Sequence, residues 1–208
     1  RAEPLILTNS ILIGCEQMTN SWKSSIGDTV NDGSARAGLH QLMVDGDLTQ
    51  FLEDRPANTP ISMAYNFWMA RCEAEGGLPK RENIDALELG PALLPHIVLL
   101  DIEQAHSIRF RYSLVGGYVE QIFGEKYTGR YLDEMDLRPV KDTVIEFYRT
   151  ASEQKKAVLL QGDYITRNRS TFKVLRLAIP MTWKGAEVGA IFAAFERDAW
   201  DAHDFAEH

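Results

Sequence analysis

The sequence predicts an α+β domain in which helices cover one face of a five-stranded antiparallel sheet. Two adjoining strands come first, helical periodicity then returns, and three further strands follow with short connections. Strands joined by so few residues pair antiparallel. An antiparallel sheet with helices between its two groups of strands is an α+β arrangement.

The first 60 residues differ from the rest and are predicted to form a partly helical extension. Residues 21–34 are polar and rich in Gly, Asn, Asp and Ser, which is typical of a loop. On either side of residues 45–47, apolar side chains repeat at i, i+3, i+4 spacing, which predicts two short amphipathic helices. The apolar residues that we expect in a dimer interface or cap are Leu39, Leu42, Met43, Leu48 and Phe51.

A longer helix is predicted to begin after Thr59, whose hydroxyl can cap it, with Pro60 at the first helical position. Gly76 ends this helix. A second helical piece over residues 84–89 stops before Pro91, which prevents a regular helix.

After Pro95 the apolar period changes from helical to strand-like. The run 97–102 is apolar except for Asp101, and residues 108–114 alternate between apolar and polar. Such alternation is typical of a half-buried strand. The remaining elements are two helices and three strands, over residues 118–123, 140–155, 158–166, 171–182 and 187–196.

Composition narrows the class of protein. The chain has 208 residues, 45% of them hydrophobic, and a net charge of -8. This charge argues against a surface that follows nucleic-acid phosphates or anionic lipid. The apolar run 5–13 is too short to span a membrane, and the two scattered cysteines, Cys15 and Cys72, fit a reducing compartment. We therefore expect a cytoplasmic protein.

The chain resembles a bacterial single-domain variant of the PAS family between about Trp68 and Glu196. The order and spacing of several short motifs carry the resemblance. These motifs are LPKR at 78–81 with ID at 84–85, LPH at 94–96, RFRY at 109–112, LVG at 114–116, FG at 123–124, TGR at 128–130, IPM at 179–181 and WKG at 183–185. Ala86 departs from the pattern, because the variant usually has proline there, and the first 60 residues lie outside it.

The resemblance implies a PAS-like five-stranded sheet and a small central cavity. It also implies a non-enzymatic sensory or regulatory role, a small-molecule ligand or signalling protein partner, and commonly a homodimer. Residues 61–198 would form the PAS-like domain, between the extension 1–60 and a tail 199–208. The residues expected to line the pocket are Phe110, Tyr112, Tyr118, Phe147, Leu177 and Phe192.

Cofactors typical of such domains are disfavoured, and the cofactor stays unknown. The helix over 140–155 contains no histidine for haem, and neither cysteine lies in the Asn-Cys-Arg context of flavin-adduct formation. No histidine lies three or four residues from another metal-binding side chain on a convincing helix, which argues against a metal.

Charged residues on the predicted strands leave alternatives open. Arg109 and Arg111 should face away from the domain interior, and Arg176 is expected to do the same. They would form cross-strand ion pairs on a solvated face, or bind an acidic ligand or partner.

Two other functions compete with a sensor. One is a small cone-like α+β enzyme, of isomerase or hydrolase type, with a pocket aspartate from Asp101 or Asp163. The other is a structural adaptor with a filled core and no ligand. Strand order discriminates the first, because a PAS sheet places its first strand centrally, beside the last.

Overall fold

The computed structural model describes residues 39–104, 107–137, 140–165 and 171–198, all within the unit formed by residues 36–208. Predictions made for residues 1–38 and 199–208, and for the loop at 166–170, lie outside the described residues.

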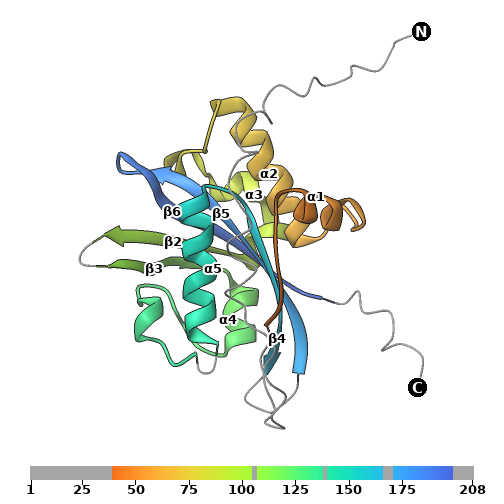
Figure 1. The fold of residues 1–208 in the computed structure, drawn as a ribbon, viewed down its shortest axis with the longest axis vertical. Helices are drawn as coiled ribbons and strands as arrows, with labels where there is room; N and C mark the ends of the chain where they lie inside the picture. The colour runs from red at the N-terminus through yellow and green to blue at the C-terminus, as the bar shows by residue number, and fades with distance from the viewer. Residues whose placement is uncertain (1–38, 105–106, 138–139, 166–170, 199–208) are drawn as a thin grey trace. The chain divides into compact units, whose positions relative to one another are not determined.

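The sheet has six strands in the order β1-β4-β5-β6-β2-β3, and every neighbouring pair is antiparallel (Figure 1). The sequence predicted five strands, so β1 is an addition. The strands are β1 (Leu39–Val44), β2 (Ile97–Gln104), β3 (Ile108–Val115), β4 (Val158–Ile165), β5 (Thr171–Trp183) and β6 (Ala186–Arg197).

The strand order distinguishes between the competing folds. The first strand of the five-stranded portion, β2, lies beside the last, β6, and both are internal to the sheet. This is the order that the PAS resemblance predicts. The fold is PAS-like.

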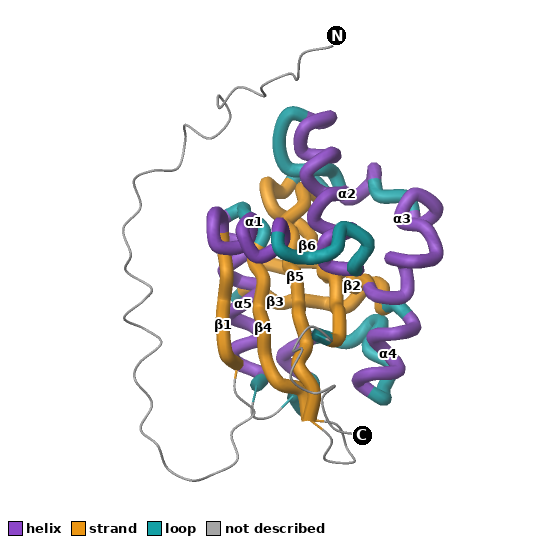
Figure 2. The backbone as a smooth tube through the Cα atoms, turned by 90° about the vertical axis from the view of Figure 1, so that its right-hand side faces the viewer, coloured by secondary structure: helices purple, strands orange, loops and turns teal. Residues whose placement is uncertain are grey.

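Helices cover both faces of the sheet, which corrects the prediction of helices on one face. The helices α4 and α5 pack on one face, and α1, α2 and α3 pack on the other (Figures 1 and 2). Both faces of β5 and β6 are therefore buried. The α-helices are α1 (Asp45–Glu53), α2 (Pro60–Glu75), α3 (Ala86–Leu93), α4 (Gly117–Phe123) and α5 (Lys141–Gln154), and three short 3₁₀ helices span Arg81–Asn83, Leu94–His96 and Leu132–Glu134.

The two faces carry two separate apolar cores because successive residues of a strand point to opposite sides. We call them the α5-side core and the α2-side core. The α5-side core includes Val98, Leu100, Phe110, Tyr112, Val119, Val144, Phe147, Tyr148, Ala178 and Phe195. The α2-side core includes Met43, Leu48, Ile61, Leu89, Leu93, Leu159, Leu175, Leu177 and Phe192.

Residues 39–44 form the edge strand β1, where the apolar spacing predicted a helix. Leu42 and Met43 lie opposite Leu160 and Leu159 of β4. Leu42 packs against the α5-side core and Met43 is buried in the α2-side core, as adjacent residues of a strand are. The prediction was wrong because six residues are too few to separate a helical period from a short apolar strand. The second predicted helix is α1.

The start of α2 follows the local chemistry that the sequence indicated. The Thr59 hydroxyl accepts a hydrogen bond from the Ser62 amide at 3.3 Å, and Pro60 is the first helical residue. Gly76 ends the helix in the left-handed region, at φ 68°. Among the described residues, no helix combines the length and apolar character that crossing a bilayer requires.

Candidate functional site

The α5-side core lies between the sheet and the helices α4 and α5, where the resemblance predicts a cavity. The alternation of β3 turns Phe110 and Tyr112 into this core. The buried face of α5 is formed by Val144, Phe147, Tyr148 and Ala151, at the i, i+3, i+4, i+7 spacing of an amphipathic helix. The predicted strand and helix thus pack on opposite sides of one apolar core.

Tyr148 and Arg176 place polar groups within this apolar core. The Tyr148 hydroxyl is fully buried and has no hydrogen-bond partner in the structure. Arg176 on β5 is only 7% exposed, and its guanidinium carbon lies 5.8 Å from the centre of the Phe195 ring. An apolar core between helix and sheet therefore contains a hydroxyl donor and a cation.

Burial keeps the hydroxyls of Tyr112 and Tyr148 protonated. It raises the pKa of Tyr112 and of Tyr148 well above the ordinary value of 10.0, because an apolar environment disfavours a phenolate. The positive charge of Arg176 lowers both pKa values, but by less than burial raises them. At neutral pH each hydroxyl is a hydrogen-bond donor and neither is a base.

Three of the six predicted pocket residues come together in this site, namely Phe110, Tyr112 and Phe147. Tyr118 on α4 is half-buried and packs its ring 4.2 Å from the His96 ring. A ligand-binding role for each of these residues stays a prediction.

Leu177 and Phe192 lie on the opposite face, in the α2-side core. The Phe192 ring stacks with Phe67 of α2, with their centres 6.1 Å apart. The sequence could not separate them from the others, because a strand buried on both faces is apolar throughout and shows no alternation.

Sequence reasoning missed Tyr148 and misplaced Arg176. Tyr148 lies in the helix predicted over residues 140–155, but a hydroxyl lacking a partner is visible only in three dimensions. Arg176 was expected to face away from the interior, and that expectation was wrong. A single charge inside the apolar run Val174–Met181 was the available signal.

The opposite face of the β2–β3 hairpin is polar and ion-paired. Arg111 Nη2 lies 2.7 Å from Asp101 Oδ2, and its Nε lies 2.9 Å from Glu103 Oε1. The cross-strand ion pairs predicted for this face are thus confirmed for Arg111. The Tyr131 hydroxyl and Arg111 hydrogen-bond to Glu103, and they hold the pKa of its carboxyl below the usual range.

Arg109 forms its ion pairs outside the hairpin. It lies 2.7 Å from Glu134 and 2.9 Å from Asp133, two residues of the segment that follows α4. Its guanidinium carbon also lies 3.9 Å from the centre of the Tyr131 ring.

Asp101, the candidate pocket aspartate of an enzyme, lies on this polar face and not in the α5-side core. It is 2% exposed, and Arg81 approaches it to 3.5 Å in addition to Arg111. Its carboxylate is thus engaged by two guanidinium groups on the polar face, away from the core where an enzyme of the competing type would need it. The side chain of Asp163 lies outside the described residues.

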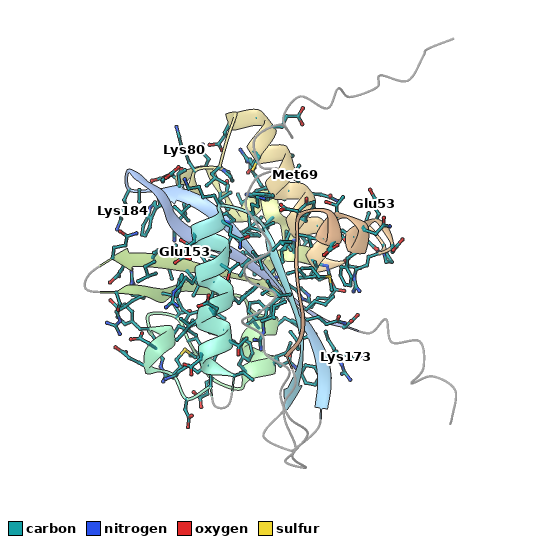
Figure 3. All side chains as sticks on the ribbon, in the orientation of Figure 1. Glu53, Met69, Lys80, Glu153, Lys173 and Lys184 are labelled. Atoms are coloured by element: carbon teal, nitrogen blue, oxygen red, sulfur yellow. The ribbon has the colours of Figure 1, made fainter. Side chains whose placement is uncertain are left out.

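The LPKR segment joins this polar face to the β5–β6 hairpin. The Thr182 amide donates to the Pro79 carbonyl at 3.0 Å, and the Arg81 guanidinium lies 4.6 Å from the Trp183 ring. Beside it is a surface depression of about 620 Å³. Its rim includes Lys80 and Lys184, both labelled in Figure 3.

Metal binding has no support from the described part of the chain, where no group of three or more His, Cys, Asp or Glu side chains could hold an ion. The tail over residues 199–208, where His203 has Asp201 and Asp204 nearby in the sequence, lies outside that part.

Comparisons with solved structures find light-oxygen-voltage domains, which belong to the PAS family. A light-oxygen-voltage domain studied with a flavin analogue matches at TM-score 0.44 and 11% identity, over 57% of this chain and 88% of that one. An RNA-binding light-oxygen-voltage receptor matches at 0.38 and 16%, over 57% and 36%. The light state of the Aureochrome1 domain matches at 0.38 and 14%, over 57% and 91%.

No protein-family model matches the sequence, and no curated protein matches it. TM-scores below 0.5 carry no argument for flavin, light or RNA in this chain. The PAS-like description therefore depends on the strand order of the sheet.

Proposed function

We propose that this chain is a non-enzymatic sensory and regulatory module of PAS type that binds a small molecule in the α5-side core. The buried Tyr148 hydroxyl carries the proposal. A buried hydroxyl without a partner costs about 1–3 kcal/mol, and a ligand atom that accepts its proton removes that cost. An apolar core with one such donor fits a ligand that is mostly apolar and carries an acceptor group.

The surroundings of the hydroxyl favour an aromatic or aliphatic ligand body. The rings of Phe110 and Phe147 lie 5.7 Å and 4.9 Å from the Tyr148 ring. The positive charge of Arg176 in the same core favours an acceptor with negative character, such as a carbonyl or carboxylate oxygen. The Tyr148 hydroxyl and the Arg176 cation together favour a ligand that is apolar except for one polar end.

Signalling would follow from helix packing and dimerisation. Ligand entry next to α5 would change how that helix packs on the sheet, and the sheet would pass the change to the helices on its other face. A homodimer or a signalling protein partner would then respond to the altered surface. In this proposal, the signal is a population shift between two packing arrangements of the helices on the sheet.

The experiment compares the native mass of the purified protein with its denatured mass. We expect an additional mass in the native spectrum that denaturation releases. Tyr148→Phe removes only the hydroxyl and should weaken retention about threefold to tenfold, the value of one hydrogen bond. The ligand-free variant should melt no earlier than the original chain.

Tyr131→Phe is the matched control, because its hydroxyl bonds to Glu103 outside the core. It should retain the same mass as the original protein. Identical native and denatured masses, together with unchanged melting in a screen of apolar carboxylates and amides, would refute the proposal and support a structural adaptor.

A further inference from the structure

Arg55 lies in the turn between α1 and α2 and reaches the end of β6. Its side chain is 6% exposed, with Nη2 2.5 Å from Glu196 Oε1 and Nη1 3.2 Å from Asp198 Oδ1. The Phe51 ring lies 5.1 Å from its guanidinium carbon. One buried cation thus joins the turn before α2 to two carboxylates at the C-terminal end of the sheet.

Glu196 also holds the start of α2. Its Oε2 accepts a hydrogen bond from the Ile61 amide at 3.1 Å. Ile61 is the second residue of the helix, where a backbone amide has no partner within the helix. Gln161 of β4 donates to Asp198 Oδ2 at 2.9 Å, which extends the network across the sheet. We call Arg55, Glu196, Asp198 and the Ile61 amide the β6 junction.

The residue before Glu196 belongs to the other core. Phe195 lies in the α5-side core, beneath Arg176 and edge-on to Phe123 of α4 at 5.6 Å. Its carbonyl oxygen lies 3.1 Å from Nδ1 of His96. Because successive strand residues face opposite sides, the proposed ligand site and the β6 junction are separated by one peptide bond.

We propose that Phe195 and Glu196 form a relay that passes packing changes in the α5-side core to the β6 junction, and so to the start of α2. Only the trigger of the relay rests on the proposed function, because the trigger is a ligand beside Arg176 and Tyr148 that would move Phe195. Displacement of this strand residue shifts the Glu196 carboxylate, and the Ile61 amide and Arg55 then lose or regain their partner. The cap formed by α1 and α2 thereby responds to an event on the far side of the sheet.

Burial makes this network suitable for a relay. An exposed ion pair re-forms in many geometries and contributes little, whereas a buried pair tolerates few arrangements and is costly to break. The Arg149–Glu146 pair of α5 is exposed by comparison, and it supplies a matched control.

The test is hydrogen exchange of single backbone amides, measured by NMR. The Ile61 amide depends on Glu196, while the Met63 amide bonds to the Thr59 carbonyl at 2.8 Å within the ordinary helical pattern. Arg55→Met removes the buried ion pair that holds the Glu196 carboxylate in place, so it should raise the Ile61 exchange rate about tenfold or more. Arg55→Lys should restore part of the protection, and Arg149→Met should leave the rate unchanged.

Transmission is tested from the α5-side core. Phe195→Leu should accelerate Ile61 exchange at least about threefold and leave Met63 unchanged, and it should add nothing when Arg55 is already Met. A merely structural ion pair would respond to Phe195→Leu through global stability, with the exchange rates of Ile61 and Met63 rising together.

Coupling must also operate in reverse, because linkage between two sites is reciprocal. Arg55→Met should therefore shift the aromatic resonances of Phe195 and Phe123, and Arg149→Met should not. This arm needs no substitution in the core. Unmoved resonances, or parallel changes at Ile61 and Met63, would overturn the relay. A chain that retains no ligand yet shows both couplings refutes the proposed function and leaves the relay standing.

Discussion

The thiol of Cys72 on α2 is kept neutral by its surroundings. Partial burial, and secondarily the negative charge of Glu75, raise its pKa from 9.0 to about 11. The reactive form of cysteine is the thiolate. Near pH 8 only roughly one Cys72 thiol in a thousand would be ionised.

We therefore predict that Cys72 reacts slowly with iodoacetamide. In a Cys15→Ser variant, the labelling rate at pH 8 should fall at least about tenfold below that of the urea-unfolded chain, and it should keep rising with pH to about 11. Intact mass spectrometry follows the reaction. A folded-state rate that levels off near pH 9 would contradict the raised pKa.

Single residues also show how much of the candidate site could be predicted from the sequence. Phe110 and Tyr112 were expected to face the interior because their strand alternates with charged residues, and both are buried. The burial of Arg176, and the position of Leu177 in the other core, could not be predicted because β5 is buried on both faces and gives no such contrast. Which face a residue of a central strand takes is decided by pairing register, and register is a long-range property.

At the level of elements, the entry into α4 depends on one glycine. A Cβ at Gly116 would lie 2.2 Å from the Pro95 carbonyl oxygen, whereas a Cβ at Gly117 would meet nothing within 4 Å. Backbone atoms cannot yield as a flexible side chain can. The close approach lets the Gly116 amide donate to the Ile97 carbonyl at 2.8 Å, which fixes α4 against the start of β2.

Gly116→Ala should therefore lower the free energy of unfolding by about 2 kcal/mol or more. Gly117→Ala, one residue further on, should change it by less than about 0.5 kcal/mol. Urea denaturation of the two variants provides a matched comparison. Equal losses for the two variants would contradict the special role of the close approach at Gly116.

The edge strand β1 shows where local periodicity stops being informative. Strands β2 and β3 were predicted well because each has a clear pattern over several residues and a change of period before it. Residues 39–44 had only a short apolar spacing, and their state is decided by pairing with β4, more than a hundred residues away. Tertiary pairing overrides a helical spacing of that length.

For the whole molecule, residues 39–58 complete the domain. Met43 of β1 and Leu48 of α1 are buried in the α2-side core, 4% and 1% exposed. Two of the predicted interface residues thus pack against the chain's own sheet, and Phe51 is partly buried there as well. A homodimer stays a prediction.

Two truncated chains separate the contribution of residues 1–38 to stability from that of residues 39–58. A chain that begins at residue 39 keeps every described contact and should retain its urea midpoint. A chain that begins at residue 59 loses the burial of Met43 and Leu48, about 1.5–3 kcal/mol for each side chain, and should unfold or aggregate. Equal stability of the two truncated chains would contradict the role of β1 and α1 in the core.

Light scattering on the same proteins then locates the predicted dimer interface. If residues 1–38 form it, the full chain has twice the mass of one copy and the chain from residue 39 has the mass of one. If the described domain forms it, the chain from residue 39 stays dimeric, because removing the segment leaves both helix layers in place. A monomeric full chain at high concentration would refute the homodimer and leave a protein partner as the receiver of the α2 movement.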